Sequence, residues 1–151
     1  NLKISNFQKK YFINKYYKPD LYMKLSKNLN SLASSSIDIS DGLFADLEKL
    51  LKKNNLTYKV FLNKIPISKN LSKFLHVRNL KKINYISKGD DYQILFTASK
   101  NNRSKIVKFS KKNGIRITRI GKILNRKERS IIIDDNLKPI TLKNKGYLHR
   151  F

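Results

Sequence analysis

One segment, residues 37–51, constrains the fold more than any other. It holds four of the ten Asp and Glu residues of a chain that carries 34 Lys and Arg. Its apolar residues have the spacing of a core-facing helical stripe, at Leu43, Phe44, Leu47, Leu50 and Leu51. The pattern predicts a strand over 36–39, then a helix that begins with Ser40 or Asp41 as its N-cap and ends at 54–55.

The remaining pattern mixes helices and strands without regular alternation or an internal repeat. Asp20 is expected to cap the helix over 21–32. The strand over 92–97 is expected to be buried on both faces, and Gly121 predicts a bulge or a close approach between backbones. This mixture favours the α+β class. Helices are predicted over 7–17, 21–32, 68–77 and 101–112, strands over 56–62, 92–97 and 115–124, and a hairpin over 130–142.

Composition limits the chemistry. At 151 residues and 40% apolar, the chain can bury one sizeable core. It has no cysteine, so a metal ion would need oxygen ligands or the two histidines, His76 and His149, and Mg²⁺ fits best. No apolar stretch approaches the roughly 20 residues that span a bilayer, and no signal segment is present. We therefore expect a cytoplasmic location and no membrane partner.

The formal charge of +24 raises the question of a nucleic-acid partner. Lysines are scattered along almost every segment, and Arg is the minority base although its planar fork suits phosphate better. Nucleic acid is therefore not expected as a partner, and a basic RNA-binding module is kept as an alternative function.

Two acidic motifs are the candidate chemistry. Asp38, at the end of a strand, and Asp41, at the start of the next helix, can face one pocket, and the free N–H groups of that helix turn attract phosphate. The second motif, 89–92, places Asp90 and Asp91 before an apolar strand, which is costly unless they are solvated or paired with a cation. The alternatives are a capped helix and a simple turn that bind nothing.

In this order, the motifs resemble the carboxy-terminal half of the thiamine-monophosphate kinase family. The chain departs from that pattern at Gln93, where the family usually has Glu, and at Arg150, which is an extra residue before the terminal aromatic. The matching pieces are Asp-Ile-Ser-Asp-Gly-Leu-Phe-Ala-Asp-Leu at 38–47, Ile-Pro-Ile-Ser at 65–68, Gly-Asp-Asp-Tyr-Gln-Ile at 89–94, Ile-Gly at 120–121 and the terminus at 146–151.

The resemblance implies a fold and an activity. The fold is that of the aminoimidazole-ribonucleotide-synthetase-like superfamily, a three-layer mixed sheet with helices that is partly ferredoxin-like. The activity is transfer of the γ-phosphoryl group of ATP to thiamine monophosphate, giving thiamine diphosphate, with Mg²⁺ as cofactor. Such chemistry depends on positioning and charge neutralisation more than on a protein base.

The resemblance also implies roles for individual residues. Asp38 and Asp41 would bind Mg²⁺, and Ser40 would contact the nucleotide. Asp90 and Tyr147 would contact the thiamine substrate. No residue is assigned as catalytic.

The chain begins with Asn rather than Met, so we expect a piece of a longer protein. Residues 1–32 are interpreted as a helical lead-in from a missing amino-terminal domain, and 33–151 as the ATP- and substrate-binding domain. The resemblance implies that the whole protein is a homodimer and that this piece alone is inactive. Another ATP-using member of the same superfamily is a further alternative.

Overall fold

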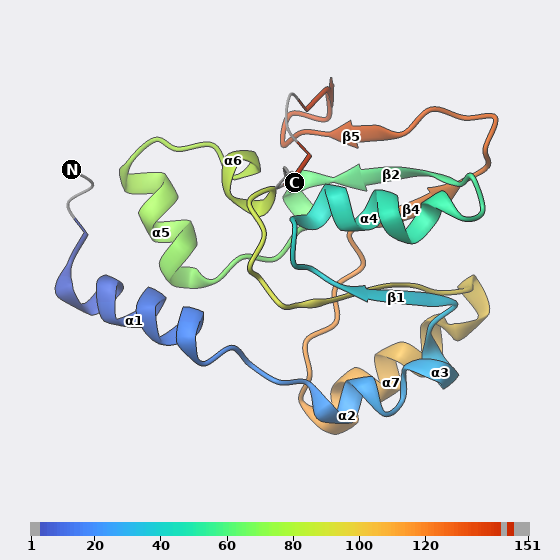
Figure 1. Ribbon diagram of the computed structural model, residues 1–151, viewed down its shortest axis with the longest axis horizontal. Coiled ribbons are helices and arrows are strands. Elements are labelled where there is room, and N and C mark those ends of the chain that lie inside the picture. Colours follow the sequence, from blue (N-terminus) through green and yellow to red (C-terminus); the bar gives the residue numbers. More distant parts are fainter. Residues whose placement is uncertain (1–3, 143–144, 147–151) are drawn as a thin grey trace, which may run out of the picture.

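The computed structural model describes residues 4–142 and 145–146, in which helices and strands alternate irregularly (Figure 1). The α-helices are α1 (Asn6–Tyr17), α2 (Met23–Ser26), α3 (Leu29–Leu32), α4 (Leu43–Lys52), α5 (Lys69–Val77), α6 (Ile83–Ile86) and α7 (Arg103–Asn113). The strands are β1 (Ser35–Asp38), β2 (Thr57–Phe61), β3 (Ile94–Thr97), β4 (Gly121–Leu124), β5 (Ile131–Ile133) and β6 (Pro139–Ile140). Two 3₁₀ turns, η1 (Leu62–Lys64) and η2 (Lys100–Asn102), complete the elements, and the predicted α+β class is confirmed.

The strands form two sheets. β1 and β3 are an antiparallel pair, and the larger sheet has the order β4-β2-β5-β6. That sheet is mixed, because β2 runs parallel to β5 whereas β4 and β6 are antiparallel to their neighbours. Gly121 lies opposite Val60, and a Cβ atom on it would lie 2.2 Å from the carbonyl oxygen of Lys59. The close approach predicted at Gly121 is therefore present.

The core lies where α4 covers the larger sheet. The apolar stripe of α4 packs against β2, and Phe44, which is fully buried, has its ring centroid 6.3 Å from that of Tyr58. Burying each large apolar side chain contributes about 1.5–3 kcal/mol. The core cluster contains Ile39, Leu43, Phe44, Leu47, Leu51, Tyr58, Val60, Leu62, Ile65, Ile86 and Ile132.

The helices outside this core form a further layer. In Figure 1, α2, α3 and α7 lie on the opposite side of the β1–β3 pair from α4, and the Asn102 side chain donates to the carbonyl of Leu32 at 3.1 Å. α1 contacts α5 through an edge-to-face pair of Phe12 and Phe74, with centroids 6.2 Å apart. Among the described residues, no helix has the length and apolar character needed to span a bilayer.

The single helix predicted over 21–32 is wrong, because α2 and α3 are separate short helices. Between them the Asn28 side chain donates to the carbonyl of Lys24 at 2.8 Å, and such side-chain bonds compete with helix continuation. The predicted cap is wrong as well. Asp20 pairs with Lys15 at 2.6 Å, and α2 has no side-chain cap.

Two predicted strands are shorter than expected. Of the segment 115–124, only Gly121–Leu124 forms the strand β4, and one further bond, from the N–H of Phe61 to the carbonyl of Ile120 at 3.0 Å, precedes it. The strand predicted over 92–97 begins at Ile94 instead of residue 92. Asp90 and Tyr92 have φ values of 58° and 49°, which a strand does not permit. β3 is half-buried along its length instead of buried on both faces, since its only partner within the described residues is β1.

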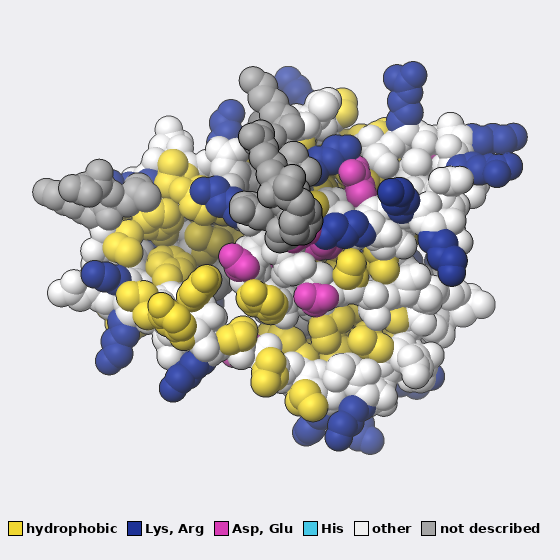
Figure 2. Space-filling view, in the orientation of Figure 1, with side chains coloured by type: hydrophobic (Ala, Val, Ile, Leu, Met, Phe, Trp, Pro, Cys, Tyr) yellow, Lys and Arg dark blue, Asp and Glu magenta, His cyan; other side chains and the backbone are white. Residues whose placement is uncertain are grey.

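Other local predictions are confirmed. Ser68 caps α5 by accepting the N–H of Leu71 at 3.1 Å. Gly114 ends α7 in the left-handed conformation with a φ of 62°. β5 and β6 form the hairpin, in which the N–H of Asp134 donates to the carbonyl of Lys138 at 2.8 Å. Figure 2 shows Lys and Arg spread over much of one face, some of them beside the few acidic side chains near its middle.

Candidate functional site

The two acidic motifs lie side by side, joined through their backbones. The N–H of Asp90 donates to the carbonyl of Ser40, and the N–H of Tyr92 donates to that of Ile39, both at 2.9 Å. In the other direction, the N–H of Ile39 donates to the carbonyl of Gln93 at 2.9 Å. These bonds extend the β1–β3 pairing beyond the strands themselves, and they bring 38–41 and 89–93 into one site.

Glycine is required where the two motifs meet. Gly89 has a φ of 86°, and a Cβ atom there would lie 2.2 Å from the carbonyl oxygen of Ser40. Gly42 has a φ of 125°, and its Cβ atom would lie 2.7 Å from the carbonyl oxygen of Ser87. A side chain at either position would push the two backbones apart.

A third segment reaches the same place from near the end of the chain. The N–H of Ala45 donates to the carbonyl of Lys145 at 3.0 Å, and a Cβ atom on Gly146 would lie 2.6 Å from the carbonyl oxygen of Asp41. Residues 145–146 therefore lie beside the amino end of α4. Tyr147 follows at once but lies outside the described residues, so its role as a substrate contact stays a prediction.

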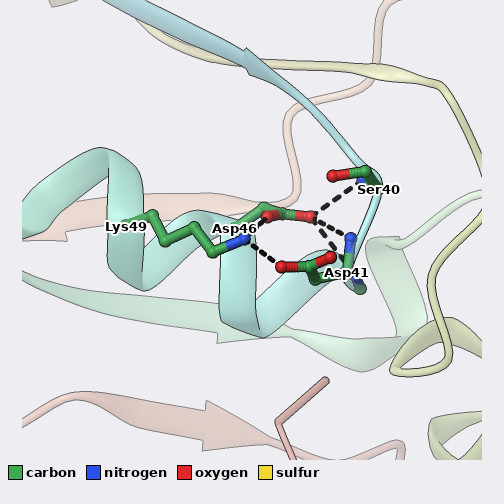
Figure 3. A network of polar contacts seen from close by, with 5 residues as sticks. Ser40, Asp41, Asp46 and Lys49 are labelled. Carbon is green, nitrogen blue, oxygen red and sulfur yellow. Dashed lines mark hydrogen bonds and ion pairs between the residues drawn. The ribbon is translucent and has the colours of Figure 1, made fainter. Parts of the chain in front are cut away.

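A buried carboxylate organises the turn before α4. One oxygen of Asp46, Oδ2, accepts the N–H groups of Ser40 and Asp41 at 2.9 Å and of Gly42 at 3.2 Å (Figure 3). The Asp46 side chain is only 1% exposed. It sits in the first turn of the helix, where the helix dipole and unpaired N–H groups stabilise negative charge.

One expectation about this turn is therefore wrong. Neither Ser40 nor Asp41 is the N-cap, because α4 begins after Gly42 and has no side-chain cap at that residue. The N–H groups of residues 40–42 already donate to Asp46. Attraction of a phosphate by the N–H groups of the helix turn itself stays a prediction.

Lys49 links this carboxylate to the candidate metal ligand. Its ammonium pairs with Asp46 Oδ1 at 2.7 Å and also with the carboxylate of Asp41 (Figure 3). The hydrogen bond to Asp41, followed by the one to Asp46, raises the pKa of Lys49 above its usual value. We call Asp41, Asp46 and Lys49 the α4 ion cluster. Two carboxylates and one ammonium leave it with a net negative charge.

The other candidate carboxylates are open to solvent. Asp38 is the last residue of β1 and is exposed, as is Asp90. The hydroxyl of Tyr92 donates to Asp90 Oδ1 at 3.3 Å. The charge of Asp90, its hydrogen bond and, more weakly, the charge of Asp38 raise the pKa of Tyr92. Both aspartates therefore act on the same side of the site.

Asp91 has a strongly perturbed carboxyl group. Desolvation and then the adjacent charge of Asp90 raise the pKa of Asp91 to about 6, although the residue as a whole keeps an exposed surface. This is the cost expected for two neighbouring aspartates at the start of an apolar strand. Asp91 therefore changes charge close to neutral pH.

The carboxylates fit Mg²⁺ in kind but do not complete a site. Asp38 and Asp41 offer the oxygen donors that this cation prefers. Across residues 4–142 and 145–146, however, no three Asp, Glu, His or Cys side chains come close enough together to hold a metal ion. His76 is exposed on α5, and His149 lies outside the described residues. Phosphate oxygens, water or other residues would have to supply further ligands.

The fold and this junction correspond to a known class of domain. Residues 16–134 match the family model described as AIR synthase related protein, C-terminal domain. The chain therefore belongs to that family. The carboxy-terminal-domain fold predicted from the sequence is confirmed.

The similar relatives are thiamine-monophosphate kinases. One from Buchnera aphidicola subsp. Acyrthosiphon pisum is 36% identical over 154 residues, which covers 99% of this chain and 46% of the relative. One from Escherichia coli strain K12 is 32% identical over 140 residues, which covers 92% of this chain and 42% of the relative. The chain thus spans about half the length of the curated relatives that it matches.

Solved structures share the fold. A structure described as AaThiL complexed with AMPPCP and TMP has a TM-score of 0.71 at 23% identity, with coverage of 97% of this chain and 43% of that one. A thiamine-monophosphate kinase from Stenotrophomonas maltophilia K279a has a TM-score of 0.70 at 25% identity, with coverage of 89% and 42%.

Two functional positions were not found from the sequence. Asp46 was noted only as part of the first motif, and Lys49 was not singled out. The available signal was their spacing, because Asp46 falls in the first helical turn after Gly42 and Lys49 follows three residues later on the same face.

Proposed function

We propose that this chain is the carboxy-terminal part of a thiamine-monophosphate kinase. The reaction is ATP-dependent phosphorylation of thiamine monophosphate to thiamine diphosphate. The observation that carries the proposal is the backbone junction of 38–41 with 89–93, which places both acidic motifs of the resemblance in one site. The similarity to thiamine-monophosphate kinases over nearly the whole chain supports it, as does the shared fold of a protein solved with the ATP analogue AMPPCP and with TMP.

The residue roles are those that the family resemblance implies. Asp38 and Asp41 would hold Mg²⁺, which when bound neutralises charge on the phosphates. Ser40 would contact the nucleotide, and its N–H is already directed at Asp46, so its hydroxyl is the group left to do so. Asp90 and Tyr147 would contact thiamine monophosphate. These residues bind and orient, and none needs to transfer a proton.

The organisation of the whole protein is part of the proposal. Residues 1–32 would connect to an amino-terminal domain, and 33–151 would form the ATP- and substrate-binding domain. The absent domain would supply the remaining metal ligands and the homodimer contacts, and this chain alone would be inactive. A cytoplasmic location completes the expectation.

The test is a fusion that restores the missing half. The chain is joined to the amino-terminal half of the Buchnera relative, and thiamine diphosphate formation from ATP and thiamine monophosphate is measured with and without Mg²⁺. We expect Mg²⁺-dependent turnover by the fusion and none by the chain alone. Asp41→Asn should lower turnover by about 100-fold, as loss of a key electrostatic contact does, whereas Asp20→Asn, on the surface, should not.

A folded fusion without turnover contradicts the proposal. Turnover of ATP that is indifferent to thiamine monophosphate would instead favour another ATP-using member of the superfamily. Both results are read from the same product analysis.

A further inference from the structure

The proposed metal ligand Asp41 already has a cation. The ammonium of Lys49 pairs with its carboxylate, and the Asp41 side chain is only 15% exposed. A divalent cation that binds Asp41 has to displace this ammonium or share the carboxylate with it.

Lys49 is held in place from its other side. Asp46 Oδ1 pairs with it at 2.7 Å, and Asp46 is itself held by its surroundings, because its second oxygen accepts three backbone N–H groups and the side chain is buried. Lys49 itself is 50% exposed. Its ammonium can therefore leave Asp41 for water at little cost and still stay paired with Asp46.

We propose that Lys49 is a built-in competitor of the divalent cation at Asp41, kept beside the site by Asp46. The proposal rests on the proposed function, which makes Asp41 a metal ligand. Without metal, Lys49 neutralises Asp41 and prevents repulsion between Asp41 and Asp46. With a cation bound to Asp41, Lys49 would give up that carboxylate and stay paired with Asp46. Lys49 is thus a positioning residue that sets the metal concentration the site requires.

Binding of Mn²⁺ to the 151-residue chain tests this without any need for turnover. Free Mn²⁺ is followed by electron paramagnetic resonance during titration, with Mg²⁺ as a competitor. Lys49→Met should bind Mn²⁺ about threefold to tenfold more tightly than the unchanged chain, because it removes one half-exposed ion pair that competes for Asp41.

The matched control is Lys52→Met. It removes the same charge from the same helix, at an exposed position, so it measures the general effect of lowering the net positive charge. Lys49→Gln serves as a second variant if Lys49→Met does not keep the far-ultraviolet circular dichroism spectrum of the unchanged chain.

The outcomes separate the two proposals. If the Lys49 and Lys52 variants bind Mn²⁺ with equal affinity and binding still depends on Asp41, Lys49 does not compete with the cation. Asp41 then remains a metal ligand. Mn²⁺ binding that is unaffected by Asp41→Asn removes Asp41 from the metal site, so the residue roles of the proposed function fail together with this inference. Absence of Mn²⁺ binding by both the unchanged chain and the Lys49 variants also overturns the competitor role, whereas the residue roles of the proposed function are then decided by the fusion, which has the remaining metal ligands.

Discussion

At the scale of single residues, Asp46 gives the turn before α4 its shape. A buried carboxylate with three backbone donors and an ammonium satisfies groups that would otherwise need solvent or a ligand. The side chains of Ser40 and Asp41 are oriented by a residue that makes no contact with substrate in the proposed reaction.

Replacing Asp46 with Ala should therefore be costly. The three N–H groups lose their acceptor, and we expect the free energy of unfolding to fall by about 3 kcal/mol. Asp20→Ala, which breaks an exposed ion pair with Lys15, should change it little. Urea denaturation of both variants measures the difference, and equal losses would contradict the role given to Asp46.

Asp91 should make stability depend on pH. Its raised pKa of about 6 means that the folded state binds the proton more tightly than the unfolded chain, so stability falls as the carboxyl group ionises between about pH 4 and pH 7. Asp91→Asn removes this penalty. After allowance for solvent screening, it should gain about 1 kcal/mol over the unchanged chain at neutral pH and nothing near pH 4. Urea denaturation across this range tests the point, and parallel curves would refute it.

At the scale of elements, the site depends on the contact between two loops and one helix end. α4 and the hairpin β5–β6 could be predicted because each follows from local spacing and turn chemistry. The division of residues 21–32 could not, since periodicity does not show that the Asn28 side chain binds the preceding turn. The start of α4 was misplaced for a similar reason, because the turn before the helix is closed by the carboxylate of Asp46, which comes from inside the helix.

Contact between the two acidic motifs could be predicted only through the family resemblance. The two acidic motifs were expected to act together by resemblance, whereas the bonds of Ile39 and Ser40 to the second motif are non-local. Positive φ values at Asp90 and Tyr92, which shorten β3, cannot be read from residue type.

Gly89 should be the most sensitive glycine of the junction. Gly89→Ala places a methyl group against the Ser40 carbonyl and should destabilise the fold by about 3 kcal/mol or more. Gly114→Ala is the matched control, since Gly114 also has a left-handed φ but no atom within 4 Å of the added carbon, and should cost about 1 kcal/mol. Thermal unfolding of both proteins would refute the argument if the losses were equal.

At the scale of the whole molecule, the positive charge is not gathered in one place. The formal charge of +24 is spread along the sequence, and Figure 2 shows basic side chains distributed over the face, at its edges and beside its acidic side chains. Such a distribution favours a general attraction to polyanions over the recognition of one particular polyanion.

Binding to RNA should accordingly be weak and non-specific. At physiological salt we expect dissociation constants of about 10⁻⁴–10⁻⁶ M for single-stranded RNA, with a steep salt dependence and no effect of Asp41→Asn. A filter-binding titration with salt decides this. Tight binding that persists at high salt would favour the RNA-binding alternative.

The pairing of β1 with β3 also has a consequence for synthesis on the ribosome. Ser35 pairs with Thr97, so the first acidic motif leaves the exit tunnel long before its partner strand exists. The segment at 145–146 arrives later still. Contacts between residues so distant in sequence form slowly, and the nascent chain therefore carries Asp38 and Asp41 unsupported while the residues up to β3 are made. Assembly of the site has to wait for β3 and then for residues 145–146.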